Sequence, residues 1–226
     1  MERILEPELM SDKIQAEAYA NADFEKSDQF IIDSFDSHFP SIEKPGNILD
    51  LGCGPGNITF KFATRFPNTK IMGIDGSVEM IRLANDIKSH SPQLLNRVSF
   101  IEGLIPNIVL PIENAENFDA IVSNSLLHHL HQPAVLWNTI KQHASINTKI
   151  FIVDLFRPPS KEKALTIVKQ YAFNEPEILQ HDFYNSLLAA FTPIEIKQQL
   201  QDAGLTELKL ETISDRHILI AGEITE

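Results

Sequence analysis

The sequence predicts an α/β fold with a doubly wound, largely parallel sheet. Short apolar runs alternate with segments of helical periodicity over most of the 226 residues. This alternation is typical of parallel strands that are joined by crossover helices. The first two expected strands both end on an acidic residue, and a glycine-rich turn follows the first of them.

Apolar runs mark seven expected strands, and the last two are joined by the polar turn 214–216. Helix starts are indicated by Ser77 as an N-cap and by Pro133 at a first helical position. The segment Thr192-Pro193-Ile194-Glu195 has the pattern of a capping box. The strands are expected to start at about residue 47 and then to cover 70–75, 98–101, 118–123, 149–154, 208–210 and 218–221.

We expect residues 1–226 to form one domain with two helical additions. Residues 1–40 contain apolar positions at helical spacing, most clearly between 28 and 38. Residues from about 157 to 191 break the alternation of strands and helices and are too long for a simple loop. Because open α/β sheets bind ligands at the carboxyl ends of their strands, this insertion is expected to form a cap over a bound acceptor.

Composition limits the partners and the compartment. The formal net charge is −12 and the Lys and Arg residues are scattered singly, which argues against nucleic acid as a main partner. The single cysteine, Cys53, excludes an internal disulfide and a cysteine-based zinc site. No apolar run could span a bilayer, and the N-terminus lacks the apolar core of a signal peptide. We expect a cytoplasmic protein without a membrane partner, as a monomer or homodimer.

The glycine-rich turn after the first strand is the most informative segment. It consists of Asp50-Leu51-Gly52-Cys53-Gly54-Pro55-Gly56-Asn57. Glycines allow a nucleotide-like ligand to approach bare backbone. A dinucleotide-binding turn needs a third glycine where Asn57 stands, so the pattern disfavours an NAD-dependent oxidoreductase. It resembles the first motif of the class I S-adenosylmethionine (SAM) dependent methyltransferases.

The resemblance extends to a second motif, Asp75-Gly76-Ser77-Val78-Glu79-Met80. It implies that Asp75 accepts hydrogen bonds from the ribose hydroxyls of SAM and that Met80 packs on the adenine. The chain departs from the family at Leu104, where many members place an acid for the adenine amino group. The cofactor-binding residues that the resemblance implies are Tyr19, Asp50, Gly52, Cys53, Gly54, Gly56, Asp75, Gly76, Met80, Gly103, Leu104, Ser123 and Asn124.

A third motif, Ser123-Asn124-Ser125-Leu126-Leu127-His128-His129-Leu130, is similar to a Leu-His-His-Leu stretch of small-molecule methyltransferases. The resemblance places His128 beside the methyl group, as a catalytic base or as a group that orients the acceptor. A purely structural histidine is the alternative. His128 and His131 are one helical turn apart, but no third ligand has an obvious spacing, so we expect no metal. Further expected acceptor contacts are Arg157, Tyr184 and Asn185.

The resemblance covers roughly residues 45–155 by motif and implies a Rossmann-like, doubly wound sheet of seven strands with an antiparallel last strand. It predicts a SAM-dependent methyltransferase that transfers the methyl group in line from the sulfonium to a small-molecule acceptor. The acceptor is expected to be small because the surface is acidic and the cap is apolar and aromatic. Two alternatives remain open: a methyltransferase acting on RNA or protein, and a non-catalytic SAM-binding module.

Overall fold

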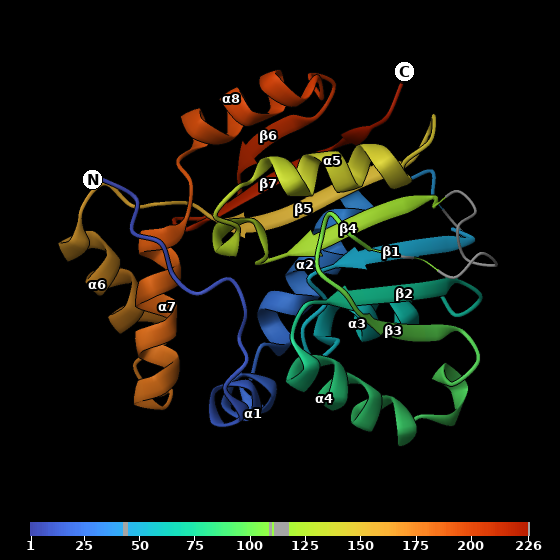
Figure 1. The fold of residues 1–226 in the computed structure, drawn as a ribbon, viewed down its shortest axis with the longest axis horizontal. Coiled ribbons are helices and arrows are strands. Elements are labelled where there is room, and N and C mark those ends of the chain that lie inside the picture. Colours follow the sequence, from blue (N-terminus) through green and yellow to red (C-terminus); the bar gives the residue numbers. More distant parts are fainter. Residues whose placement is uncertain (43–44, 109, 111–117, 226) are drawn as a thin grey trace.

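The computed structural model describes residues 1–42, 45–108, 110 and 118–225, which form a seven-stranded sheet with helices around it (Figure 1). The strands lie in the order β3-β2-β1-β4-β5-β7-β6. Their bounds are β1 (Asn47–Leu51), β2 (Lys70–Asp75), β3 (Val98–Glu102), β4 (Ala120–Asn124), β5 (Lys149–Leu155), β6 (Lys209–Thr212) and β7 (His217–Glu223).

Strands β1 to β5 pair in parallel, whereas β7 is antiparallel to both of its neighbours, β5 and β6. The predicted doubly wound sheet with an antiparallel last strand is therefore confirmed. The strand order reverses direction between β1 and β4. Such a switch point leaves a crevice at the carboxyl ends of the strands, where α/β proteins bind their ligands.

The helices cover both faces of the sheet and the edge at which the parallel strands end. Their bounds are α1 (Lys13–Asn21), α2 (Glu25–His38), α3 (Asn57–Arg65), α4 (Val78–Ser89), α5 (Ala134–His143), α6 (Lys161–Tyr171), α7 (Glu177–Ala189) and α8 (Pro193–Ala203), with short 3-10 turns at Pro92–Leu94 and Leu127–His129. Among the described residues, every helix is too short or too polar to cross a membrane.

Two apolar clusters hold these layers together. Alternate residues of the buried strands point to opposite faces, so Ile150 belongs to the cluster under α5 and α8, while Phe151 belongs to the cluster under α2 and α3. In the first cluster, the buried Trp137 of α5 donates its indole N–H to Gln199 of α8 at 3.1 Å. In the second, the ring of Phe35 lies edge-on to those of Phe62, Phe66 and Phe151.

The helix starts that the sequence indicated are present, and one of them, that of α5, is shifted by one residue. The Ser77 hydroxyl accepts a hydrogen bond from the Met80 amide, as an N-cap does. Thr192 and Glu195 form the predicted capping box at the start of α8. Pro133 is the residue before the first turn of α5 and not its first helical residue.

Helices α6 and α7 form the predicted helical insertion and pack on each other around an apolar cluster of their own. Figure 1 shows them, with α1 and the N-terminal segment, beside the edge of the sheet where the parallel strands end. The amide of Ile4 donates to the carbonyl of Leu188 in α7 at 3.1 Å. The N-terminal segment and α7 therefore lie together over that edge.

Replacing Phe35 by Ala is expected to lower the free energy of unfolding by about 3–5 kcal/mol, because the ring is fully buried and the change leaves a cavity. Phe173→Ala is the matched control, since that ring is 74% exposed. We expect the control to change stability by less than about 0.5 kcal/mol. Urea unfolding of both variants measures the difference, and equal losses would contradict the assignment of Phe35 to the core.

Candidate active site

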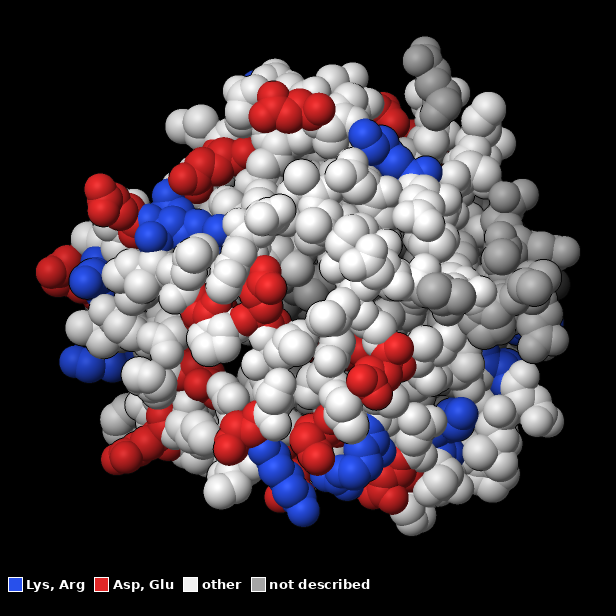
Figure 2. Space-filling view, viewed as in Figure 1, with Lys and Arg blue, Asp and Glu red and all other residues white. Residues whose placement is uncertain are grey.

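A cavity of about 1060 Å³ opens at the carboxyl ends of the parallel strands. Its walls come from the glycine turn after β1, the ends of β2 to β5, the histidine-containing turn after β4, and helices α1, α2 and α7. In Figure 2, acidic side chains lie beside a hollow in the middle of this face. The volume is at the upper end of what small-molecule sites occupy, so it can hold a nucleoside-sized ligand together with a second small molecule.

The three glycines of the turn have different tasks. All have a positive φ: 72° at Gly52, 54° at Gly54 and 91° at Gly56. A Cβ at Gly52 would meet Leu126 at 2.9 Å, and one at Gly56 would meet Phe60 at 2.8 Å. A Cβ at Gly54 would meet nothing within 4 Å, because Gly54 borders the cavity. Gly54 thus leaves its backbone open to a ligand, whereas the other two allow close packing.

The carboxylate of Asp75 holds this turn in place from the end of β2. One oxygen accepts the amide N–H of Gly54 at 2.9 Å, and the other accepts the amide N–H of Ser77 at 2.8 Å. Burial raises the pKa of Asp75, although the two backbone hydrogen bonds act to lower it. Asp75 borders the cavity, so its remaining lone pairs are available to donors of a ligand.

Asp50, at the end of β1, is 1% exposed and also borders the cavity. Burial raises its pKa to about 7. The hydroxyl of Thr59 donates to Oδ2 at 2.5 Å, and this hydrogen bond acts to lower the pKa. Nearby Asp75 adds to the rise. An anionic Asp50 is therefore costly in the free protein and is stabilised by a cationic group in the cavity.

His128 is held by Asp154 at the end of β5. The Nδ1 atom lies 2.6 Å from Oδ1 of Asp154, whose oxygens also accept the amides of Leu127 and Leu155 at 2.7 Å. Since the carboxylate can only accept, Nδ1 is the donor and Nε2 points away from Asp154. Burial acts to lower the pKa of His128, but the charge and hydrogen bond of Asp154 outweigh it and raise that pKa.

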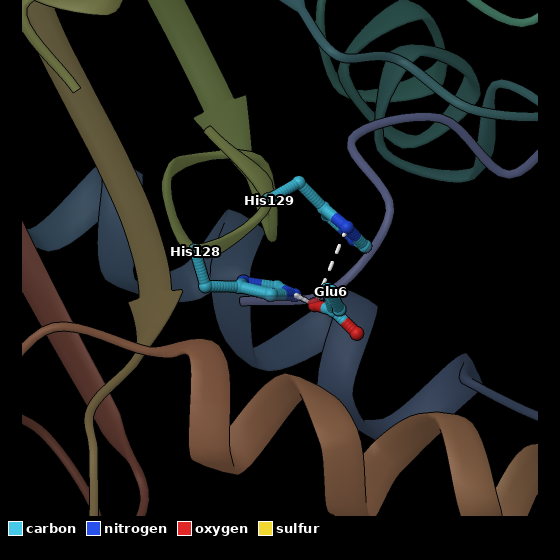
Figure 3. Close-up of side chains that lie close together, drawn as sticks. All are labelled: Glu6, His128 and His129. Carbon is cyan, nitrogen blue, oxygen red and sulfur yellow. Dashed lines mark ion pairs between the residues drawn. The ribbon is translucent and has the colours of Figure 1, made fainter. Parts of the chain in front are cut away.

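The N-terminal segment contributes residues that sequence reasoning missed. The guanidinium of Arg3 donates to the carbonyls of His128 at 2.8 Å and Leu130 at 3.0 Å. Glu6 places Oε1 3.6 Å from Nε2 of His128 and 3.3 Å from Nδ1 of His129 (Figure 3). These contacts join segments far apart in sequence, so no spacing rule could have found them. Asp154 was identifiable as a third acid at a strand end, but its bond to His128 was not.

Most of the predicted cofactor residues meet at the cavity. Its lining includes Tyr19, Asp50, Gly52, Cys53, Gly54, Asp75, Gly76, Met80, Gly103, Leu104 and Asn124, together with His128. Gly56 and Ser123 are not part of the lining. The Ser123 hydroxyl instead donates to the carbonyl of Leu51 at 2.7 Å, and Gly56 packs against Phe60 and Phe100.

The predicted acceptor contacts other than His128 lie outside the lining. Arg157 is buried and pairs with Glu195 at 2.7 Å while it donates to the carbonyl of Ala190 at 3.1 Å, so it joins α8 to the end of α7. Tyr184 packs against the apolar cluster between α6 and α7, and Asn185 does not border the cavity either. The face of α7 that does border it carries Leu179, Asp182, Phe183 and Ser186. Tyr184 and Asn185 therefore lie on this helix but outside its cavity-lining face, and their contact with an acceptor stays a prediction.

Comparison with known proteins identifies the family. Residues 42–204 match the family described as "Methyltransferase domain". The chain belongs to this methyltransferase family. It is 34% identical over 91 residues to the malonyl-(acyl-carrier protein) O-methyltransferase of Halalkalibacterium halodurans. This match covers 40% of the chain and 32% of that protein. It is 32% identical over 90 residues to a trans-aconitate 2-methyltransferase of Rhodopseudomonas palustris, with 39% and 32% covered. Each match spans about a third of the relative's own length.

Solved structures agree on the fold of this methyltransferase-family chain. A SAM-dependent methyltransferase from Aquifex aeolicus aligns with a TM-score of 0.66 at 16% identity, over 95% of this chain and 99% of that chain. The plantazolicin methyltransferase in complex with SAH aligns with a TM-score of 0.63 at 20% identity, over 95% and 96%. At these identities, the likeness shows the fold.

The raised pKa of Asp50 makes stability depend on pH. Because this pKa lies above that of an unfolded aspartate, the folded chain keeps a proton that the unfolded chain releases, and stability falls as pH rises from about 4 to about 7. Asp50→Asn removes this dependence and can still accept from Thr59. As the pH rises from 5 to 8, the free energy of unfolding of the variant should increase by about 2 kcal/mol relative to that of the natural chain. Denaturant unfolding of both proteins at both pH values measures this change. The same stability difference at pH 5 and pH 8 would contradict a raised pKa of Asp50.

Proposed function

We propose that the chain is a SAM-dependent methyltransferase acting on a small-molecule acceptor. The observation that carries this proposal is the open backbone of Gly54, which borders the cavity between the carboxylates of Asp50 and Asp75. A ligand with a cationic amino acid end and a ribose diol is complementary to such a site. SAM has both groups.

The residues around the cavity fit the parts of this cofactor. Asp50 is buried with a raised pKa and is stabilised as an anion by an ammonium group. Asp75 has lone pairs left for ribose hydroxyls after its two backbone bonds. Met80, Leu104 and neighbouring Ile105 form an apolar wall suited to an adenine ring.

SAM supplies a methyl group that its sulfonium already activates. The chain then has to align the acceptor atom with the methyl group and to exclude water. The N-terminal segment and α7 enclose the side of the cavity where His128 lies. In this proposal, His128 contacts the acceptor from the cavity wall. Asp154 binds Nδ1 of His128, which leaves Nε2, 3.6 Å from Glu6, as the nitrogen that Asp154 does not hold.

A small acceptor is supported by the enclosure of the cavity and by the relatives. Two curated relatives are named for methylation of a malonyl-acyl-carrier protein and of trans-aconitate. We extend the proposal to the organisation of the chain: residues 1–40 and 157–191 form the cap of a single domain. A monomer or homodimer in the cytoplasm remains our prediction.

Gly54→Val should abolish SAM binding, measured by titration calorimetry, because its side chain projects into the cavity. Gly204→Val is the matched control. Gly204 also has a positive φ of 72°, and a Cβ added there would meet nothing within 4 Å, yet it caps α8 away from the cavity lining. Both variants should lose similar stability, and only the first should lose the cofactor. Retained affinity in Gly54→Val would place the cofactor elsewhere.

Methyl-labelled SAM should transfer label to a small-molecule fraction of a cell extract when the protein is added. His128→Gln should reduce the transfer rate at least tenfold while SAM affinity stays within about twofold, because the residue acts on the acceptor. Label in RNA or protein would contradict the small-molecule acceptor. Unchanged transfer by His128→Gln would contradict the role of this histidine.

A further inference from the structure

Three side chains from two distant segments converge at the end of the cavity that α7 covers. Oε1 of Glu6, Nε2 of His128 and Nδ1 of His129 all lie within 4.8 Å of one another (Figure 3). Glu6 comes from the N-terminal segment, and the histidines come from the turn after β4. Carboxylate oxygen and imidazole nitrogen are the usual protein ligands of zinc and related divalent ions.

The geometry places these three ligand atoms face to face. Asp154 accepts the hydrogen bond of Nδ1–H of His128, so the other ring nitrogen, Nε2, faces Oε1 of Glu6 at 3.6 Å. Oε1 is buried and has no hydrogen-bond partner among the described residues, while the other oxygen of Glu6 accepts from Ser186 at 3.3 Å. A positive centre beside this oxygen stabilises the anionic form of the buried carboxyl group.

The guanidinium of Arg3 interacts electrostatically with Glu6, but its hydrogen bonds go to other groups. The guanidinium of Arg3 donates to the backbone carbonyls of His128, Leu130 and Ala189, and it lies over the ring of Phe191 at 3.7 Å. A single proton can bridge Glu6 and His128, but it cannot also satisfy His129. A metal ion accepts all three donors at once.

We propose that Glu6, His128 and His129 bind a divalent transition-metal ion, with zinc as the first probe. Two imidazoles and one carboxylate make a set that leaves a fourth position of a tetrahedral ion open. His128 and His129 border the cavity, so an ion held by them lies at its wall. Asp154 is the carboxylate that orients a ligand histidine through its second nitrogen. In the free chain, Nδ1–H of His129 donates to the carbonyl of Pro7 at 3.4 Å. Metal binding breaks this long contact and requires the tautomer of His129 with its proton on Nε2.

This inference rests on the proposed function only for the role of the ion. In that role, the ion binds a lone pair of the acceptor at the cavity. The Nε2 atom of His128 then meets the acceptor through the ion. Because Glu6 belongs to the N-terminal segment, metal binding also fixes that segment across the cavity. Spacing along the sequence led to the expectation of no metal because it could not reveal Glu6 as the third ligand.

The test is zinc titration of the full chain after removal of metals with a chelator, followed by calorimetry and by metal analysis after dialysis. We expect one equivalent of zinc for the natural chain. Glu6→Gln and His129→Gln should each weaken binding at least tenfold, with thermal unfolding confirming that both variants fold. His90→Gln, at the exposed end of α4, is the matched histidine control and should bind as the natural chain does.

Absence of stoichiometric zinc, or equal affinity in Glu6→Gln and the natural chain, would overturn the proposal. The measurement needs no turnover and no SAM, so it is separate from the proposed function. Zinc bound by a chain that does not bind SAM supports the metal site and contradicts the methyltransferase proposal. SAM binding by a chain that binds no zinc contradicts the metal site and leaves the methyltransferase proposal supported.

Discussion

The hydrogen bonds of Asp75 are the contacts on which the cavity depends. This carboxylate accepts one amide from the glycine turn and one from the first residues leading into α4. It therefore fixes two neighbouring strand ends relative to each other with a single side chain. Backbone bonds from Gly52 and Cys53 to the carbonyl of Ile74 hold the start of the turn, and Asp75 adds the side-chain bond that orients the amide of Gly54 toward β2.

Buried acids at strand ends recur across the sheet. Asp75 ends β2, Asp50 and Asp154 lie one residue before the ends of β1 and β5, and each accepts at least one hydrogen bond. Burying carboxylates is costly unless such donors are present. The chain thus concentrates negative charge at one edge of the sheet, where the fold itself opens a crevice.

The parts of the fold that could be predicted are those encoded by neighbouring residues. The strands, the Ser77 cap and the Thr192 capping box depend on local periodicity and local hydrogen bonds, and they are present. Pairs such as His128–Asp154 and Glu6–His128 depend on how distant segments meet, and no local pattern records that. The same holds along α7: the adjacent aromatics Phe183 and Tyr184 both pack against the cluster between α6 and α7, and only Phe183 also borders the cavity.

The position of Trp137 has a spectroscopic consequence. It is the one tryptophan of the chain, and its indole is buried between α5 and α8 with its N–H bonded to Gln199. It is not part of the cavity lining. Its emission, excited selectively over that of the three tyrosines, therefore reports the packing of that sheet face. Unfolding of this layer can be followed through one natural side chain, with no label added.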